Sequence, residues 1–291
     1  MREIEYTVAR TAGEATALMT EKGKLAKVLA GGTDILVQLR GGRHNIDRLV
    51  DIKDVPEVNE LSYDPGKGLV LGAAVPCYRI YQDSAVSQAY PGLIDAAALI
   101  GGIQIQGRAT LGGNLCNAAP SADGIPPLIV LNATCVIAGP NGGREVAAEE
   151  FCTAPGQNIL KDGEFLVSMR FPPPSKHSGA HYLRFIPRNE MDIAVAGVGA
   201  SVVLDSSGKS FVSARIALVS VAPTPLFVKE AGAALAGKEI SDGAIDAAAE
   251  AAMAAAKPIS DMRGTIRQRI HLVGVLTRRS LKGAIARAKE A

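Results

Sequence analysis

The chain has 291 residues, of which 47% are hydrophobic and 21% are charged, the balance of an ordinary soluble globular protein. Its net charge of +2 gives no reason to expect nucleic acid or an anionic membrane as the main partner. No segment approaches the roughly 20 apolar residues that span a membrane, and the charged first residues are unlike a secretory signal, so we expect a cytoplasmic protein.

The first fifty residues predict strand, helix, strand, helix, strand. The predicted strands are Glu3–Ala9, Ala26–Ala30 and Arg48–Ile52, and the helices run from Thr11 to about Glu21 and from Asp34 to Arg40. The pair Gly31-Gly32 follows the second strand directly. This order predicts a βαβ-type unit with a glycine turn at the carboxyl end of a strand, where such folds usually bind ligands.

The next hundred residues mix helices and strands and end at three prolines. The predicted strands are Gly68–Leu71, Ala73–Pro76, Cys135–Ala138, Glu145–Val146 and Phe165–Phe171, and the predicted helices are Cys77–Asp83, Gly92–Ile100 and Gly124–Asn132. Because Pro172, Pro173 and Pro174 interrupt regular structure, we place a domain boundary there. The domains are then 1–176, with subdomains of about 1–55 and 56–176, and 177–291.

The remainder predicts an α+β domain, a three-stranded sheet backed by helices. Its strands are His181–Phe185, Ile193–Leu204 and Val212–Val221, and its helices are Pro225–Ala236, Ser241–Ala256 and Asp261–Lys289. A row of arginines follows one side of the last helix. A solvated surface and a contact with a partner subunit both remain open for that row.

Two glycine pairs, Gly31-Gly32 and Gly112-Gly113, indicate the binding chemistry. Residues without Cβ atoms let backbone N–H groups come close to a bound anion. Flanking side chains that can add hydrogen bonds are Thr33, Asp34, Thr110 and Asn114. Two such segments, each bracketed by apolar residues, predict a clamp on a pyrophosphate.

Other chemical motifs fail on spacing. Gly208-Lys209-Ser210 lacks the first P-loop glycine because position 203 is Val, and Gly197-Val198-Gly199 lacks the third dinucleotide-binding glycine. Four scattered cysteines form no CxxC pair, and His177 and His181 follow the prolines, so we expect no metal site and no catalytic residue. A chain that cradles a nucleotide and supplies few acids or bases usually leaves the reaction to a cofactor.

Several segments together resemble one known family. They are Ala30–Asp34, Arg108–Leu115, Ser121–Asp123, Tyr182–Phe185, Asp192–Ala194 and Asp261–Leu276. The chain resembles the FAD-binding (medium) subunit of the xanthine dehydrogenase and carbon monoxide dehydrogenase family, the flavoprotein component of molybdenum hydroxylases. The likeness spans the whole chain, although Gln268 stands where many relatives have Tyr.

The resemblance implies a two-subdomain FAD-binding fold of the vanillyl-alcohol-oxidase (PCMH) type, followed by the C-terminal α+β domain. It implies noncovalent FAD, because neither glycine segment contains a histidine, and no four-cysteine insertion for an extra iron–sulfur cluster is present. The implied FAD-binding residues are Leu29, Ala30, Gly31, Gly32, Thr33, Asp34, Ile35, Ile100, Thr110, Gly112, Gly113, Asn114, Ser121, Asp123, Leu166 and Arg184.

The resemblance also implies partners and a role. A molybdopterin-binding large subunit and a small subunit with [2Fe-2S] clusters would complete a dimer of heterotrimers. FAD on this chain would collect electrons and pass them to NAD or another acceptor. A free-standing flavin-dependent oxidase or reductase on the same fold, and a nucleotide-binding scaffold without activity, remain alternatives. The substrate of the complex (carbon monoxide, a purine, an aldehyde or an N-heterocycle) is left open.

Overall fold

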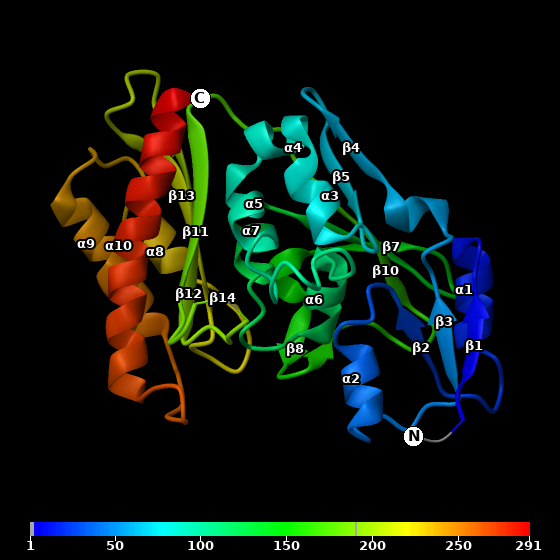
Figure 1. The fold of residues 1–291 in the computed structure, drawn as a ribbon. Coiled ribbons are helices and arrows are strands. Elements are labelled where there is room, and N and C mark those ends of the chain that lie inside the picture. Colours follow the sequence, from blue (N-terminus) through cyan, green and yellow to red (C-terminus); the bar gives the residue numbers. More distant parts are fainter. Residues whose placement is uncertain (1–2, 190) are drawn as a thin grey trace.

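The computed structural model describes residues 3–189 and 191–291. Figure 1 shows an N-terminal block (blue), a central block (cyan to green) and a C-terminal block (yellow-green to red) arranged side by side. Each of the three blocks contains both helices and strands, as expected from the sequence.

The N-terminal block is a parallel sheet of order β1-β3-β2. Its elements are β1 (Glu5–Val8), α1 (Ala12–Met19), β2 (Ala26–Leu29), α2 (Ile35–Arg40) and β3 (Arg48–Asp51). Thr11 caps α1 as predicted, because its hydroxyl accepts a hydrogen bond from the Glu14 N–H. Because the three strands are parallel, the loop between β2 and α2, which contains Gly31 and Gly32, leaves the sheet at its carboxyl edge.

The central block is an antiparallel sheet of order β4-β5-β10-β6-β7 with helices on it. Its strands are β4 (Leu61–Asp64), β5 (Gly68–Gly72), β6 (Thr134–Ala138), β7 (Arg144–Ala147) and β10 (Phe165–Phe171), with the small pair β8 (Cys152–Ala154) and β9 (Gln157–Asn158) beside them. Its helices are η1 (Pro56–Asn59), α3 (Cys77–Gln82), α4 (Ser84–Ala89), α5 (Pro91–Ala97), α6 (Leu111–Asn117), α7 (Ile125–Val130) and η2 (Ala148–Glu150).

Two central predictions differ from the structure. The expected strand over Ala73–Pro76 is wrong: the chain leaves the sheet at Gly72, and a turn hydrogen bond runs from the Val75 N–H to the Gly72 carbonyl. Gly112 and Gly113 do not form a bend but the first turn of α6, which Thr110 caps by accepting from the Gly113 N–H. The Thr110 side chain thus converts an expected loop into a helix start.

The C-terminal block is an antiparallel sheet of order β11-β12-β13-β14 with helices on both faces. Its elements are β11 (Ser178–Phe185), β12 (Ala196–Leu204), β13 (Phe211–Val219), β14 (Leu226–Phe227), α8 (Lys229–Ala233), α9 (Asp242–Ala255) and α10 (Ile266–Glu290). In Figure 1, α10 crosses the outer face of the sheet, while α5 and α7 of the central block pack on the other face.

This block corrects two predictions. The sheet has a fourth strand of two residues, because Leu226 and Phe227 pair with β13 where a helix had been expected from Pro225. The last helix begins at Ile266 rather than Asp261, because Thr265 caps it and Asp261–Gly264 forms a turn. No helix in the described part of the chain is long and apolar enough to cross a membrane.

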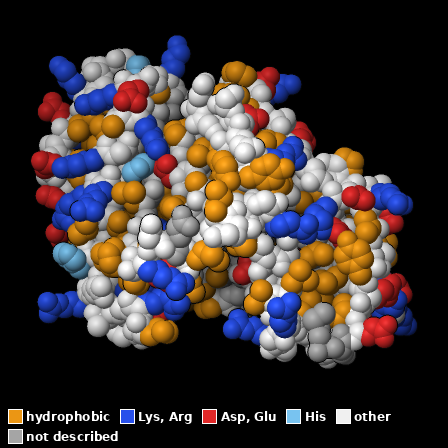
Figure 2. Space-filling view, in the orientation of Figure 1, with side chains coloured by type: hydrophobic (Ala, Val, Ile, Leu, Met, Phe, Trp, Pro, Cys, Tyr) orange, Lys and Arg blue, Asp and Glu red, His pale blue; other side chains and the backbone are white. Residues whose placement is uncertain are grey.

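The basic row on α10 is largely used within the chain. Arg278 pairs with Asp246 at 2.5 Å and Lys282 with Asp242 at 2.9 Å, and both acids lie on the neighbouring α9. Arg287 instead reaches Asp95 of the central block. Figure 2 shows the resulting mixture of blue and red side chains over the C-terminal block. These exposed pairs fit a solvated surface, the first of the two interpretations of the row.

Close packing of α10 on β11 predicts a contrast between two glycines. A Cβ at Gly179 would lie 2.2 Å from the Ala284 carbonyl oxygen, whereas a Cβ at Gly243 in α9 would meet nothing within 4 Å. Gly179→Ala should lower the free energy of unfolding by about 1–3 kcal/mol because it forces the helix away from the sheet. Gly243→Ala should raise it by about 0.5–1 kcal/mol through helix propensity. Chemical denaturation of both variants measures this, and equal effects would contradict the packing argument.

Candidate functional site

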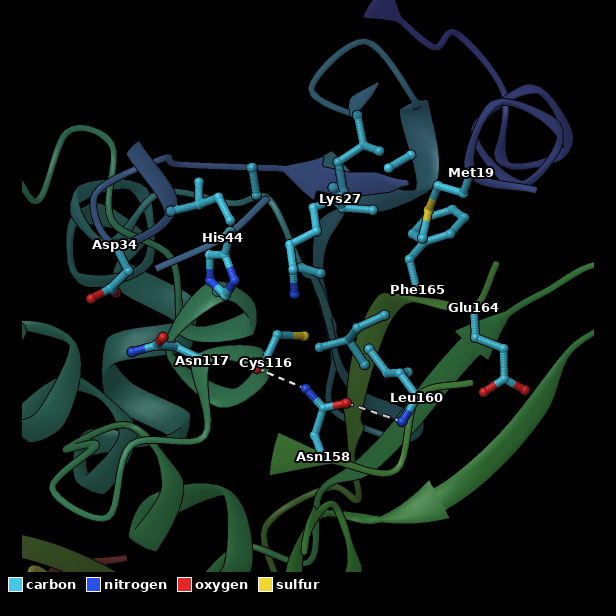
Figure 3. A pocket seen from close by; sticks show the side chains of 18 of the residues that line it. Met19, Lys27, Asp34, His44, Cys116, Asn117, Asn158, Leu160, Glu164 and Phe165 are labelled. Carbon is cyan, nitrogen blue, oxygen red and sulfur yellow. Dashed lines mark hydrogen bonds between the residues drawn. The ribbon is translucent and has the colours of Figure 1, made fainter. Parts of the chain in front are cut away.

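A cavity of about 810 Å³ lies between the N-terminal and central blocks. Its wall runs from the end of α1 and the strand β2, through the glycine loop and α6, to the segment that enters β10 (Figure 3). This volume falls within the roughly 300–1,000 Å³ of sites that bury most of a small organic ligand.

Most of the predicted site residues meet at this cavity. Twelve of them line its wall: Ala30, Gly31, Gly32, Thr33, Asp34, Ile35, Ile100, Thr110, Gly112, Gly113, Asn114 and Leu166. The other four, Leu29, Ser121, Asp123 and Arg184, are not part of this wall. Leu29 is buried in the core. Ser121 and Asp123 lie between α6 and α7, and Arg184 lies on β11 of the C-terminal block.

The first glycine loop owes its shape to a contact between backbones. A Cβ at Gly31 would lie 1.9 Å from the Arg108 carbonyl oxygen, and the Arg108 guanidinium donates to the Gly31 carbonyl at 3.3 Å. Gly32 has a φ of +82°, which side chains rarely adopt. Within the described residues, no acceptor meets the backbone N–H groups of this loop from Gly31 to Asp34. The loop therefore keeps a run of free donors on residues that line the cavity.

The second glycine pair serves mainly in packing. A Cβ at Gly112 would lie 2.5 Å from the Ala73 carbonyl oxygen, so α6 fits closely on the chain leaving β5. A Cβ at Gly113 would meet the Thr110 hydroxyl at 2.9 Å, and the Gly113 N–H is already bonded to that hydroxyl. This N–H is thus not free for a ligand, contrary to the expectation of two equivalent loops.

Three cavity residues that no sequence motif indicated form a chain of hydrogen bonds across the two blocks. His44 Nε2 lies 2.8 Å from the Gln38 Oε1, and the Gln38 side-chain amide donates to Asn117 Oδ1 at 2.9 Å. Gln38 belongs to α2, and Asn117 ends α6. Gln38 and Asn117 are 79 residues apart, so local pattern could not connect them.

Two further residues that the sequence did not single out, Lys27 and Arg43, bring positive charge to the wall. Burial, and then the charges of Lys27 and Arg43, lower the pKa of the His44 imidazole, so all three groups lie near one another. Figure 3 shows the Lys27 ammonium pointing into the cavity from β2. Lys27 could have been found from the sequence, because it lies on the predicted strand that precedes the glycine loop.

Two carboxylates on the wall are compensated by arginines. The Arg144 guanidinium donates two hydrogen bonds to the Glu164 carboxylate, at 2.9 and 2.7 Å, and these bonds lower the pKa of that carboxyl to about 2. Glu21 pairs with Arg48 at 2.6 Å. In contrast, no described carboxylate pairs with Lys27 or Arg43. Asp34 is open to solvent, yet the nearby wall displaces enough water to raise its pKa. Lys27 and Arg43 therefore bring two unpaired positive charges to a wall on which the Asp34 carboxylate is also unpaired among the described residues.

The far end of the cavity is more apolar. Met19, Leu160 and Phe165 lie there (Figure 3). Leu166, beside a bulge in the β10–β6 pairing, also lines the cavity. Asn158 fixes this end, because its amide donates to the Cys116 carbonyl at 2.7 Å and accepts from the Leu160 N–H at 3.0 Å. The cavity thus combines backbone donors and cations beside the glycine loop with several apolar side chains at its far end.

Cys116 is the one cysteine on this wall. Burial raises the pKa of its thiol to about 12, so the sulfur stays protonated and a weak nucleophile. Among the described residues, no group of three or more His, Cys, Asp and Glu side chains has the arrangement of a metal site.

Asp123 and Arg184 pair with each other outside the cavity wall. Arg184 contacts Asp123 Oδ2 at 2.5 Å, and the Tyr182 hydroxyl donates to Oδ1 at 2.6 Å. All three side chains are more than 90% buried. Burial raises the pKa of Asp123, an effect that the charge of Arg184 and the Tyr182 hydrogen bond oppose. This cluster joins the central and C-terminal blocks.

Comparisons with known proteins identify the family. Residues 2–174 match the FAD binding domain in molybdopterin dehydrogenase, and residues 181–284 match the CO dehydrogenase flavoprotein C-terminal domain. The chain is 33% identical to the xanthine dehydrogenase FAD-binding subunit of Escherichia coli O157:H7, over 97% of this chain and 96% of that one. It is also 33% identical to the carbon monoxide dehydrogenase medium chain of Hydrogenophaga pseudoflava, over 97% of each.

The fold agrees with this relationship. A structure of carbon monoxide dehydrogenase from Hydrogenophaga pseudoflava, lacking the Mo-pyranopterin moiety of its molybdenum cofactor, superposes with a TM-score of 0.93 and 33% identity over 98% of each chain. The predicted combination of a two-subdomain FAD-binding fold and a C-terminal α+β domain is thereby confirmed. The chain belongs to the FAD-binding medium subunits of the xanthine dehydrogenase and carbon monoxide dehydrogenase family, the oxidoreductase flavoproteins of molybdenum hydroxylases.

Proposed function

We propose that the cavity between the N-terminal and central blocks is the FAD site, and that the diphosphate of FAD lies against the loop from Gly31 to Asp34. The observation that carries this is the run of free N–H donors beside uncompensated charge on Lys27 and Arg43. FAD brings two negative charges, and a partly enclosed dianion needs such donors and cations. The residues present therefore fit the cofactor.

We also propose roles for the remaining predicted residues. Thr110 and Asn114 supply polar groups, and Ile100 and Leu166 supply apolar contact to one or other ring system. Asp123 and Arg184 are kept as binding residues by family resemblance, although both lie outside the cavity wall. We propose that binding is noncovalent, because neither glycine segment contains a histidine.

The proposed role in the complex is electron transfer. Bound flavin can accept electrons one at a time and release two, which suits a subunit between iron–sulfur clusters and a two-electron acceptor. The partners would be a molybdopterin-binding large subunit and a [2Fe-2S] small subunit in a dimer of heterotrimers. NAD or another external molecule would be the acceptor, in the cytoplasm. We propose domains 1–176 (subdomains about 1–55 and 56–176) and 177–291 for this flavoprotein.

Flavin binding and turnover by the isolated chain test the function. The apo chain should take up one FAD per chain and show flavin absorption bands, because the cavity is complete within this chain. The loaded chain should not oxidise carbon monoxide, purines, aldehydes or N-heterocycles, since in this proposal substrate oxidation belongs to the molybdopterin-binding partner subunit. Absence of bound FAD would refute the proposal, and steady substrate turnover would instead support a free-standing flavin oxidase or reductase.

Substitution of Gly32 tests the loop geometry. Gly32→Ala should weaken FAD binding about tenfold, because a side chain disfavours the φ of +82° by about 1–2 kcal/mol and would turn the N–H groups away. Gly41→Ala is the matched control, since Gly41 has a φ of −79° and its Cβ would be 3.4 Å from the nearest atom. FAD titration by fluorescence quenching measures both. Equal affinity of the two variants would remove the loop from the site.

Substitution of Lys27 tests the charge argument. Lys27→Met should weaken FAD binding about three- to tenfold at low salt and flatten its dependence on salt concentration. Riboflavin, which lacks the phosphates, should bind wild type and variant alike. Lys67→Met, a change at an exposed turn between β4 and β5, is the control. A salt dependence that stays the same in Lys27→Met would show that this cation does not meet the diphosphate.

A further inference from the structure

The C-terminal block contributes nothing to the described cavity wall, which is formed by residues between Met19 and Leu166. Nevertheless, it holds the loop between α6 and α7 at two points. The Ser220 N–H donates to the Pro120 carbonyl at 2.7 Å, and the Asp123 carboxylate is held by Tyr182 and Arg184. The C-terminal block thus fixes the chain directly after the second glycine segment.

Two residues join this loop to the cavity. The Gly124 N–H, next to Asp123, donates to the side-chain oxygen of Asn114 at 2.9 Å. A Cβ at Gly124 would lie 2.7 Å from the same oxygen, so the Asn114 side chain packs directly against Gly124. Because its oxygen is used in this way, Asn114 keeps its side-chain NH₂ as a donor, and no described residue accepts from it.

We propose that Tyr182 and Arg184 are positioning residues of the C-terminal domain, which fix the donor orientation of Asn114 on the cavity wall through Asp123 and Gly124. This inference rests on the proposed function, since the donor would serve FAD. Tyr182 needs no contact with the cofactor for this role, and Arg184 has this role in addition to the binding role proposed for it above. Their effect passes through one carboxylate, one backbone N–H and one amide.

The geometry favours a positioning role over simple adhesion of two blocks. Each carboxylate oxygen of Asp123 has its own donor, so the group cannot rotate without losing a charged or a buried hydrogen bond. A second interdomain bond offers a contrast. The Ser201 hydroxyl on β12 donates to the Val130 carbonyl of α7 at 2.7 Å, and Val130 is not among the residues that line the cavity.

Tyr182→Phe is the direct test, because it keeps the buried ring and removes the hydroxyl. In the full-length apo chain it should weaken FAD binding about tenfold, the effect of one buried hydrogen bond to a charged group. The visible spectrum of bound flavin should shift, since the Asn114 donor is displaced. Ser201→Ala should leave FAD affinity within about twofold of wild type although it removes an interdomain bond of the same kind.

A double-mutant cycle separates positioning from general loss of stability. In an Asn114→Ala background, Tyr182→Phe should change FAD affinity by at most about twofold, because the group it positions is gone. Additive effects of Tyr182→Phe and Asn114→Ala would overturn the proposal. If Tyr182→Phe does not fold, Gly124→Ala, whose Cβ would lie 2.7 Å from the Asn114 side-chain oxygen, is carried through the same cycle.

The outcome is distinguishable from failure of the proposed function. Wild-type chain that binds no FAD removes the function and the inference together. Wild-type chain that binds FAD, with a Tyr182→Phe variant of equal affinity and an unchanged flavin spectrum, leaves the FAD site intact and removes the positioning role alone.

Discussion

The cavity depends on one backbone contact, where the glycine loop of the N-terminal block meets Arg108 of the central block. A Cβ at Gly31 would lie 1.9 Å from the Arg108 carbonyl oxygen, a distance at which backbones must separate. The two blocks are also joined by the apolar cluster that contains Val50, Ala74 and Phe165. The missing Cβ therefore sets how closely the two walls approach, and with it the width of the cavity between them.

This contact changes the reason why glycine is needed. The sequence alone led us to expect that both glycine pairs allow close approach of a ligand. In the structure, Gly31 and Gly112 make room for neighbouring backbone, and Gly32 provides a left-handed turn. Access of an anion to the N–H groups is a result of that arrangement. A glycine-rich segment can thus be essential to a site whose ligand never reaches the missing Cβ atoms.

The sequence predicted what depends on local pattern. Thr11 and Glu14 indicated the start of α1, and the proline run indicated the end of β10. The three strands expected after the prolines are present as β11 to β13, although β11 begins three residues earlier and β12 three residues later than expected. It missed what depends on distant pairing. Phe227 joins the sheet because Ala217 is opposite and the Arg215 guanidinium lies 4.0 Å above its ring. The approach of Lys27, Arg43 and His44 follows from the path of α2, which local pattern does not determine.

The residues predicted along the glycine segments line one cavity, whereas local pattern did not indicate how the buried charges are compensated. Family resemblance indicated Asp123 and Arg184 but not that each is the other's partner. Burial makes that pairing necessary, because an isolated carboxylate or guanidinium in this position would cost several kcal/mol. Once paired, Asp123 is rigid, and so is Gly124 beside it. A buried ion pair between domains adds little net stability as a rule, so its placement next to the cavity helix is better explained by the orientation it imposes on Asn114.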